Sequence, residues 1–500
     1  MAATAPPPTS PLSTLKMRLG DMNALHAAIG IMDWDMQTYM PPGGSEARAQ
    51  HVSRLMRMHH DLFTSDEVQR LVEESSRGAT GDDAAMLRVV KRELDQATKI
   101  PAALVEEKAK LTSTAFDIWV KARAANDFKS FAPYLERVVE IVREEAEYLG
   151  YKDHIYDALI DLYEEGATTA DCRQMFDGIR QPLTDLVRAI AAKPQVDDSV
   201  LHGAWSEPAQ KAFTEMIVKA VGFDFQRGRQ DKAAHPFCTG WSIGDIRLTT
   251  RYKDNLLSAI FSSLHEAGHG MYEQFSPKEW DLTPLCGGVS LGLHESQSRT
   301  WENLVGRSRA FWVRFLPDLK QAFPQLAALD VDSFYRMANK VQPSLIRVEA
   351  DEVTYNLHVL IRFELECDML TGALTVRDLP EAWSSKYQTY LGVRPATDSE
   401  GCLQDVHWSG GSIGYFPTYS MGTVLSFQIW ASMARDLGDL DAVIQRGDLA
   451  SIHGWLVEKI YSQGRRYTPK ELVQRVTGKP FETHDYLKGL TAKYAALYGL

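Results

Sequence analysis

Residues 256–277 read LLSAIFSSLHEAGHGMYEQFSP. Large apolar side chains recur in this stretch every three or four positions, which is the spacing of a helix with one buried face. The pair Ser276-Pro277 interrupts that spacing, and proline cannot continue a helix. We therefore predict a buried helix that ends just before Pro277.

The same stretch holds an HExxH motif, formed by His265, Glu266 and His269. Two histidines four positions apart lie on one face of a helix, where both imidazoles can bind one zinc ion. Glu266 lies beside them, and a carboxylate there can accept the proton of an attacking water as a general base. In its helical context the motif predicts a zinc-dependent hydrolase rather than a chance match.

Two histidines leave a catalytic zinc ion one protein ligand short, so a third ligand is expected from a neighbouring helix. A glycine-rich loop at 286–292 leads into HESQSRTWE at 294–302, where we predict a helix that continues through Leu304. Glu295 is the predicted third ligand, and the adjacent His294 is the alternative. Without the HExxH motif, an acidic residue at a helix start would be interpreted as a surface charge favoured by the helix dipole.

The composition of the 500 residues is that of an ordinary globular protein, with 44% hydrophobic and 24% charged residues. A net charge of −12 argues against a general nucleic-acid-binding protein, which usually needs a basic face. Five scattered cysteines without a CxxC pair fit a reducing compartment. We find no secretory signal and no apolar run near 18 residues, so we expect a cytoplasmic protein without a membrane partner.

The chain shows no internal repeat and no long linker. Residues 1–12 are rich in proline, alanine and threonine and predict a disordered tail. Helical periodicity dominates residues 13–500, for which we predict a single, mainly α domain. A helical chain of this length can also split into two lobes around a cleft. The best strand signal lies at 241–252, where a short hairpin or small sheet is expected.

Further motifs flank the HExxH helix in a fixed order. DIRLT at 245–249, IRVEAD at 346–351 and GCLQDVHW at 401–408 fit the patterns DxRxT, IRxxAD and GxxQDxHW. Together with HEAGH and HESQ, they resemble the thermostable carboxypeptidase family of zinc metallocarboxypeptidases. Weaker blocks, Trp34-Asp35 with MPPGG at 40–44 and HPF at 235–237, extend the resemblance over nearly the whole chain.

The resemblance implies a mainly helical, two-lobed fold with a deep active-site groove, a small β-sheet beside the zinc helix, and a homodimer. It implies release of single C-terminal residues with broad preference, using Zn²⁺, for which Co²⁺ can substitute. It assigns Arg347, which we place in a long helix over 345–370, to the peptide's terminal carboxylate. Arg247 is the other candidate and could instead shape the closed end of the groove. Taken alone, Arg347 would be interpreted as a structural ion pair with Asp351.

The segment 404–421 is rich in glycine, serine and aromatic residues and predicts a substrate-lining loop. His407 and Tyr419 are the candidate donors to the oxyanion that forms during peptide hydrolysis. Tyr415 competes with them and is also a candidate substrate-binding residue. Each aromatic side chain taken singly would be interpreted as a packing residue. Asp405 is expected to orient His407 or another side chain.

Other functions stay open at this point. A zinc oligopeptidase or dipeptidyl-releasing peptidase would share the HExxH helix and the groove. A non-catalytic peptide-binding protein would not require Glu266. A purely structural zinc site would be closed and usually built from cysteines, and no cysteine lies at a suitable spacing.

Overall fold

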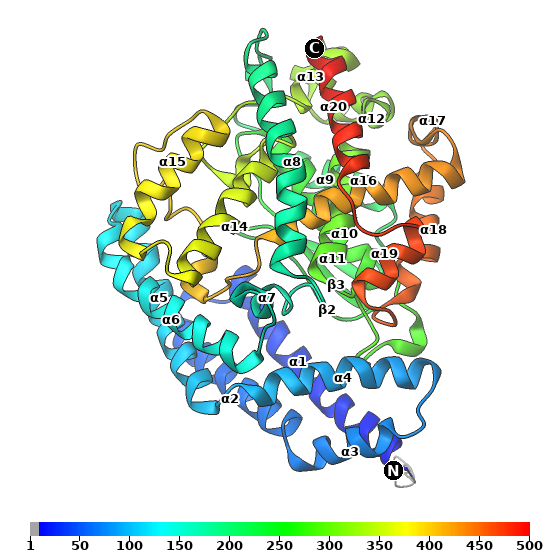
Figure 1. Ribbon diagram of the computed structural model, residues 1–500. Coiled ribbons are helices and arrows are strands. Elements are labelled where there is room, and N and C mark those ends of the chain that lie inside the picture. Colours follow the sequence, from blue (N-terminus) through cyan, green and yellow to red (C-terminus); the bar gives the residue numbers. More distant parts are fainter. Residues whose placement is uncertain (1–9) are drawn as a thin grey trace.

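The computed structural model describes residues 10–500 and is mainly α-helical, as predicted. The helices before the sheet are α1 (Pro11–Thr38), α2 (Ser45–Phe63), α3 (Asp66–Ser76), α4 (Gly81–Lys99), α5 (Ala102–Ala125), α6 (Phe128–Leu149), α7 (Ile155–Ile160), α8 (Thr169–Ala191) and α9 (Glu207–Val221). Those after it are α10 (Leu256–Gln274), α11 (Leu291–Arg299), α12 (Arg309–Ala322), α13 (Val331–Ala338), α14 (Tyr355–Thr371), α15 (Leu379–Leu391), α16 (Pro417–Leu437), α17 (Leu440–Gln445), α18 (Leu449–Lys459), α19 (Pro469–Thr477) and α20 (His484–Tyr498). In Figure 1, α1 to α4 form the lower part of the molecule, and α10, α11 and α16 lie at its centre.

The chain enters α1 through Ser10, whose hydroxyl accepts a hydrogen bond from the Ser13 backbone N–H. Proline at the first helical position suits this start, because its N–H would have no partner there. Residues 1–9 of the tail predicted for residues 1–12 lie outside the described residues. Pro11 and Leu12 already belong to α1.

The predicted hairpin is confirmed as β2 (Cys238–Ser242) paired antiparallel with β3 (Asp245–Thr250). A further strand, β1 (Gly228–Lys232), pairs parallel with β3 and gives the order β1-β3-β2. Sequence analysis missed β1 because its residues are polar. Two of its buried side chains have specific partners: Gln230 donates to the Thr214 hydroxyl, and Asp231 accepts from Arg229 and from the Tyr39 hydroxyl.

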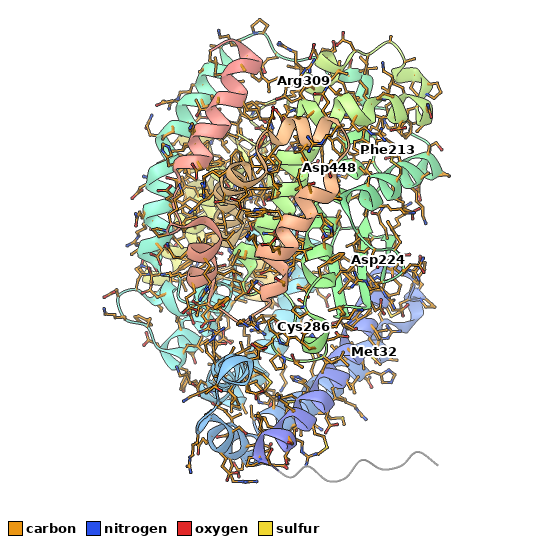
Figure 2. All side chains as sticks on the ribbon, turned by 90° about the vertical axis from the view of Figure 1, so that its right-hand side faces the viewer. Met32, Phe213, Asp224, Cys286, Arg309 and Asp448 are labelled. Carbon is orange, nitrogen blue, oxygen red and sulfur yellow. The ribbon has the colours of Figure 1, made fainter. Side chains whose placement is uncertain are left out.

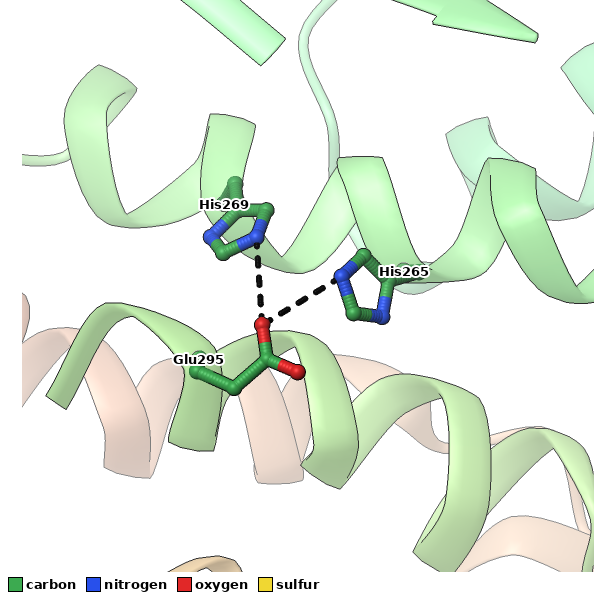
Figure 3. Close-up of side chains that lie close together, drawn as sticks. All are labelled: His265, His269 and Glu295. Carbon is green, nitrogen blue, oxygen red and sulfur yellow. Dashed lines mark ion pairs between the residues drawn. The ribbon is translucent and has the colours of Figure 1, made fainter. Parts of the chain in front are cut away.

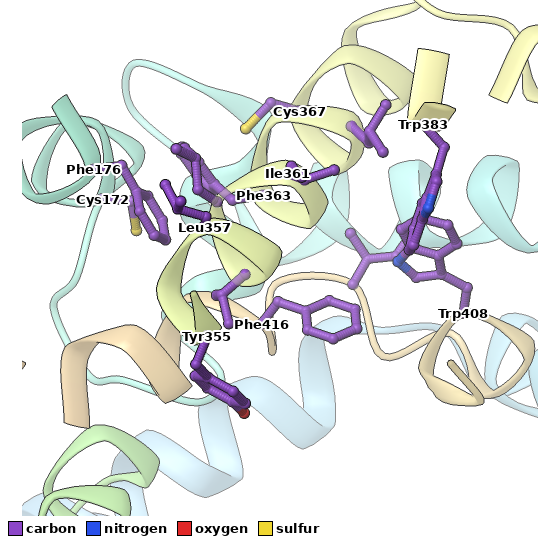
Figure 4. Packing of buried hydrophobic residues seen from close by; sticks show 14 of the residues in the cluster. Cys172, Phe176, Tyr355, Leu357, Ile361, Phe363, Cys367, Trp383, Trp408 and Phe416 are labelled. Carbon is purple, nitrogen blue, oxygen red and sulfur yellow. The ribbon is translucent and has the colours of Figure 1, made fainter. Parts of the chain in front are cut away.

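Two large apolar clusters correspond to the two lobes of the expected fold. The first joins α5 to α8 with α14, α15 and α20, and Figure 4 shows Phe363 and Trp383 packed inside it. The second surrounds α10 and includes the sheet, α9, α12, α17 and α18. Helix α16 contributes to both clusters, since Val424 belongs to the first and Leu425 to the second. The two lobes therefore meet along α16.

A smaller apolar cluster holds α1, α3 and α4 together. Cys286, which follows α10 in the chain and is labelled in Figure 2, packs against this cluster. The N-terminal helices are therefore attached to the segment that joins α10 to α11. Within residues 10–500, no helix is both long and apolar enough to cross a lipid bilayer.

A groove of about 1580 Å³ is lined by α1, α2, α5 and the segment that forms β2. Trp34 and Trp241 contribute to its wall, together with Phe116 and Trp119 of α5. Ile346 and Val406 also line it, and they are the chain neighbours of Arg347 and His407. The groove therefore reaches the segments that the sequence motifs singled out.

Two expectations about local structure were wrong. Residues 345–370 do not form one helix: Arg347–Glu349 make a 3₁₀ turn, and α14 starts only at Tyr355. The reason is that the Gln404 side chain binds the backbone here. It accepts from the Arg347 N–H and donates to the Leu345 carbonyl, two groups that would otherwise make helical hydrogen bonds. The segment 404–421 is not simply a loop either.

That segment contains a 3₁₀ turn at His407–Gly410 and the first turn of α16. Tyr419 therefore stands on a helix, and most of the segment is buried. Its glycines serve the packing: Gly414 has φ +93°, and a Cβ there would lie 2.7 Å from the Leu159 carbonyl carbon.

Candidate metal centre

The helix carrying the HExxH motif has the predicted bounds. The Asn255 side chain accepts from the Leu257 N–H and caps the start of α10, and the helix ends at Gln274, before Ser276-Pro277. Its apolar residues lie in the second core cluster. This burial directs His265 and His269 toward α11 (Figure 3).

Glycines bring α11 close to α10 and α16. A Cβ added to Gly268, inside the HExxH motif, would lie 2.6 Å from the Gln297 carbonyl oxygen on α11. A Cβ on Gly422 of α16 would lie 2.4 Å from Glu295 Cβ. Both values are far below van der Waals contact, so these helix spacings depend on the absence of a side chain.

The close packing brings His265, His269 and Glu295 together (Figure 3). The Nε2 atoms of the two histidines lie 3.4 and 3.6 Å from Glu295 Oε2. The candidate ligand atoms all lie within 4.8 Å of one another, and no other such cluster of three occurs within residues 10–500. The two predicted histidines and the predicted glutamate therefore converge on one point.

Neighbouring charges orient Glu295 and His265. Arg299 donates its Nε–H to Glu295 Oε1 at 2.6 Å, which leaves Oε2 facing the histidines. Burial alone would raise the pKa of Glu295, but Arg299 and His265 outweigh it and lower that pKa to about 2. Glu302 lies 2.9 Å from His265 Nδ1 and accepts from Arg299 as well.

The alternative ligand, His294, is directed elsewhere. Its Nδ1 lies 2.9 Å from His269 Nδ1, and its Nε2 lies 2.5 Å from Glu273 Oε1. Both ring nitrogens are therefore engaged outside the cluster. The structure favours Glu295 over His294 as the third member of the set.

Glu266 lies next to the cluster and is 7% exposed. Burial raises the pKa of Glu266 to about 7, with the charges of Glu295 and Glu302 acting in the same direction and His265 opposing them. A bound cation would lower this pKa again. A carboxylate in such surroundings exchanges protons near neutral pH, which suits a general base.

The simple helix interpretation expected an ion pair between Arg347 and Asp351, but Arg347 pairs with Asp405 instead. Its Nε and Nη2 donate to Asp405 Oδ1 at 3.0 and 2.8 Å, and Arg362 donates to Asp405 Oδ2 at 2.6 Å. Asp405 was expected to orient His407 or another side chain, and the side chains that it binds are these two guanidinium groups. Arg347 is 5% and Arg362 0% exposed, so two buried positive charges share one carboxylate.

The predicted oxyanion donors lie beside this charge cluster. His407 Nε2 is 3.3 Å from the Tyr419 hydroxyl, and the rings of Tyr415 and Tyr419 are 5.3 Å apart. Burial and the nearby Arg347 lower the pKa of His407 to about 4. Burial raises the pKa of Tyr415 and Tyr419, and the charge of Glu295 acts in the same direction on both.

Arg247 lies against Trp34 and Trp241, two residues that line the groove. It makes two hydrogen bonds of 2.9 Å to Asp245 on the same strand. Its guanidinium carbon is 4.3 Å from the Trp34 ring centroid and 4.7 Å from that of Trp241. This arrangement explains the Trp34 block and the DxRxT motif as one unit.

Sequence analysis missed several supporting residues. Glu273 follows His269 by four positions, and Arg299 follows Glu295 by four, so helical spacing could have found both. Glu302 ends the HESQSRTWE stretch at 294–302, and no role was predicted for it. It reaches His265 through a π-helix at Thr300–Gly306, a feature that no simple periodicity predicts.

We predict that Gly268→Ala destabilises the protein by about 1–3 kcal/mol, because the new methyl group must push α11 away from α10. Urea denaturation of the purified protein measures this. Gly454→Ala on α18 is the control, since a Cβ there meets nothing within 4 Å. The control should gain about 0.5–1 kcal/mol from the higher helix propensity of alanine. Equal effects of the two substitutions would contradict the close-packing argument.

Comparisons with known proteins agree with this geometry. A family model described as Carboxypeptidase Taq (M32) metallopeptidase matches residues 14–494. Thermostable carboxypeptidase 1 of Thermus thermophilus is 41% identical over 483 residues, covering 93% of this chain and 94% of that protein. Carboxypeptidase 1 of Bacillus subtilis is 38% identical over 479 residues, covering 94% and 95%.

Solved structures show the same fold. The crystal structure of the M32 carboxypeptidase from Deinococcus radiodurans R1 matches with a TM-score of 0.96 at 41% identity, covering 98% of this chain and all of that chain. Trypanosoma cruzi metallocarboxypeptidase 1 matches with a TM-score of 0.93 at 34% identity, covering 97% and 99%. Because these matches span nearly the whole chain, it belongs to the M32 carboxypeptidase family and is a metallocarboxypeptidase.

Proposed function

We propose that this metallocarboxypeptidase uses zinc to hydrolyse the last peptide bond of peptides with a free C-terminus, releasing single residues with broad preference. The observation that carries the proposal is the convergence of His265, His269 and Glu295 beside the buried Glu266. Two imidazole nitrogens and one carboxylate oxygen are a donor set that catalytic zinc sites use.

His265, His269 and Glu295 would hold the metal, and Co²⁺ can substitute because imidazole and carboxylate also suit it. When bound, such an ion supplies Lewis-acid polarisation of the scissile carbonyl and lowers the pKa of a water at the site. Glu266 accepts the proton of the attacking water and then returns it to the leaving amine. Its burial and its place in the chain next to His265 support this role.

His407 and Tyr419 stabilise the oxyanion as neutral hydrogen-bond donors. The low pKa of His407 keeps its ring uncharged near pH 7, and the raised pKa of Tyr419 keeps its proton in place. Tyr415 lies against both side chains and contacts the substrate. A neutral donor is useful here because it gains strength only as negative charge develops.

Arg347 binds the terminal carboxylate of the peptide. The support is electrostatic: Arg347 and Arg362 face the single charge of Asp405, so the cluster carries one positive charge in excess. A buried excess charge attracts an anion of opposite sign. Arg247, held between two tryptophans at the groove wall, is the second substrate-binding residue.

The native assembly that we propose is a cytoplasmic homodimer. The support for the dimer is the family resemblance. All five cysteines are free thiols, and three of them, Cys172, Cys367 and Cys402, are buried, which suits a reducing compartment.

A peptide ladder experiment tests the proposed reaction. A ten-residue peptide with a free C-terminus should lose one residue at a time, as followed by mass spectrometry, and a chelator should stop the reaction. The same peptide with a C-terminal amide should be cleaved at least about 100-fold more slowly, because the amide removes the charge that Arg347 binds. Internal cleavage, or release of dipeptides from both peptides, would show an oligopeptidase instead.

A further inference from the structure

The two histidines of the metal cluster are held in the same orientation. Both turn Nε2 toward Glu295 and Nδ1 away from it. The partner of each Nδ1 differs in kind: His265 faces the carboxylate of Glu302, whereas His269 faces a second imidazole, His294. A histidine that ligates through Nε2 must carry its proton on Nδ1, so each Nδ1 needs a hydrogen-bond acceptor.

The contacts of His294 determine where its proton lies. Glu273 Oε1, 2.5 Å from His294 Nε2, is an acceptor, so Nε2 carries the proton and donates it. Nδ1 of His294 is then unprotonated and accepts from the Nδ1–H of His269 at 2.9 Å. The three side chains form one directed chain of hydrogen bonds, from His269 through His294 to Glu273.

Two glycines fix the outer end of this chain. The Gly288 N–H donates to Glu273 Oε1 at 3.1 Å. A Cβ on Gly288 would lie 2.3 Å from the His294 ring, and a Cβ on Gly287 would lie 2.7 Å from Glu273 Oε2. Gly287 also has φ +88°, a conformation that other residues rarely adopt. The glycine turn between α10 and α11 therefore packs directly on the pair formed by His294 and Glu273.

The fold places these groups by helical spacing. His265, His269 and Glu273 follow one another at intervals of four on α10, so they lie along one face. His294 stands next to Glu295 on α11. The same two helices therefore supply both the candidate ligands and the side chains behind His269.

We propose that His294 and Glu273 are positioning residues that hold His269 in the tautomer and orientation needed to ligate through Nε2. His294 thus serves the metal indirectly, as the acceptor behind a ligand. Glu302 performs the corresponding task for His265 with a direct carboxylate contact. This inference rests on the proposed metal site and extends it to the groups behind one ligand.

Metal retention, measured without substrate, tests the proposal. The zinc-loaded full-length protein is mixed with a chromogenic chelator, and the rate of zinc loss is followed by absorbance. Loss of a partner behind a ligating histidine typically weakens metal affinity about 10–100-fold, so His294→Phe should release zinc faster by a factor in that range. Glu273→Ala should change the rate in the same direction by a smaller factor, because His294 keeps its acceptor nitrogen.

His294→Asn separates positioning from packing. The asparagine carbonyl oxygen can occupy the place of the histidine Nδ1 and accept from His269, so this variant should recover most of the retention lost in His294→Phe. His453→Phe is the matched control. This half-buried histidine packs against Phe275 just beyond α10 without touching the cluster, and its replacement should leave the zinc-loss rate unchanged.

The outcomes distinguish the possible failures. If His294→Phe loses zinc at the wild-type rate, or if His294→Asn loses it as fast as His294→Phe, the positioning role is wrong. A lower melting temperature of the zinc-free form of His294→Phe, with unchanged zinc loss, would assign His294 to packing alone. If the wild-type protein itself retains no zinc, the proposed function fails instead.

Discussion

Glu266→Gln is expected to lower kcat by about 10²–10⁴-fold, the usual contribution of a general base. Glutamine has nearly the same shape but cannot accept a proton at neutral pH. The substituted position is 7% exposed, so bulk water cannot easily replace the lost base. Glu266 is not one of the three clustered ligand residues, and the variant should retain its metal.

The measurement is kcat on an N-acylated dipeptide with a free C-terminus, determined for the wild-type enzyme and for Glu266→Gln. The metal content of both proteins is measured alongside. Glu164→Gln provides a matched control. Burial raises the pKa of Glu164 to about 7 as well, but its carboxylate accepts from the Ser290 hydroxyl and the Gly292 N–H at the start of α11. Glutamine can keep both bonds, since the serine hydroxyl can reverse its role.

The control variant should stay within about threefold of the wild-type kcat, because its hydrogen bonds remain. Substantial turnover by metal-loaded Glu266→Gln would remove Glu266 from the role of base. Loss of metal together with activity would show instead that Glu266 helps to bind the ion.

Asp405→Asn is expected to reduce the free energy of unfolding by about 3–5 kcal/mol, the usual effect of removing one partner of a buried ion pair. Asp405 accepts from both Arg347 and Arg362, and an asparagine leaves two buried guanidinium groups without a counter-charge. Its amide NH₂ would also face one of these donors. Urea denaturation at pH 7 measures the difference.

The pH dependence of stability has a defined sign here. Burial alone would raise the pKa of Asp405, but Arg347 and Arg362 outweigh it and hold that pKa well below its ordinary value. The stabilisation is therefore fully present above the unfolded pKa of about 4 and is lost as the pH falls toward the folded pKa. The difference between wild type and Asp405→Asn should shrink below about pH 4.

Asp318→Asn is the control for this prediction. Asp318 pairs with Arg314 on the exposed face of α12, where such pairs contribute about 0–1 kcal/mol. An Asp405→Asn protein as stable as this control would show that the buried charges find other partners.

The residues of the candidate site could be predicted from the sequence because their chemistry requires particular residue types at short spacings. HExxH places two candidate ligands and a candidate base at helical spacings that depend on nothing distant, so roles for His265, Glu266 and His269 could be proposed directly. Glu295 required only that a second helix pack nearby. The hairpin was visible in the strand signal at 241–252, whereas the polar β1 was not, because its buried side chains bind partners outside the strand, Thr214 for Gln230 and Tyr39 for Asp231.

The contacts of Arg347 could not be predicted for a related reason. A local pattern suggested a pair with Asp351, four residues away. The actual partner, Asp405, lies 58 residues further along the chain, and Gln404 beside it also removes Arg347 from any helix. Partners so distant in sequence are chosen by the packing of α14 against the segment before α16, which periodicity does not encode.

The position of α16 has a consequence for how the protein is made. About 135 residues separate Glu302 from the end of α16 at Leu437, and a ribosome adds them in roughly 7–27 s at ~5–20 residues per second. During that interval Glu295 lacks Gly422, against which it packs in the finished protein. The candidate ligands are thus synthesised early and enclosed late, which would leave them open to an ion while residues 303–437 are still emerging.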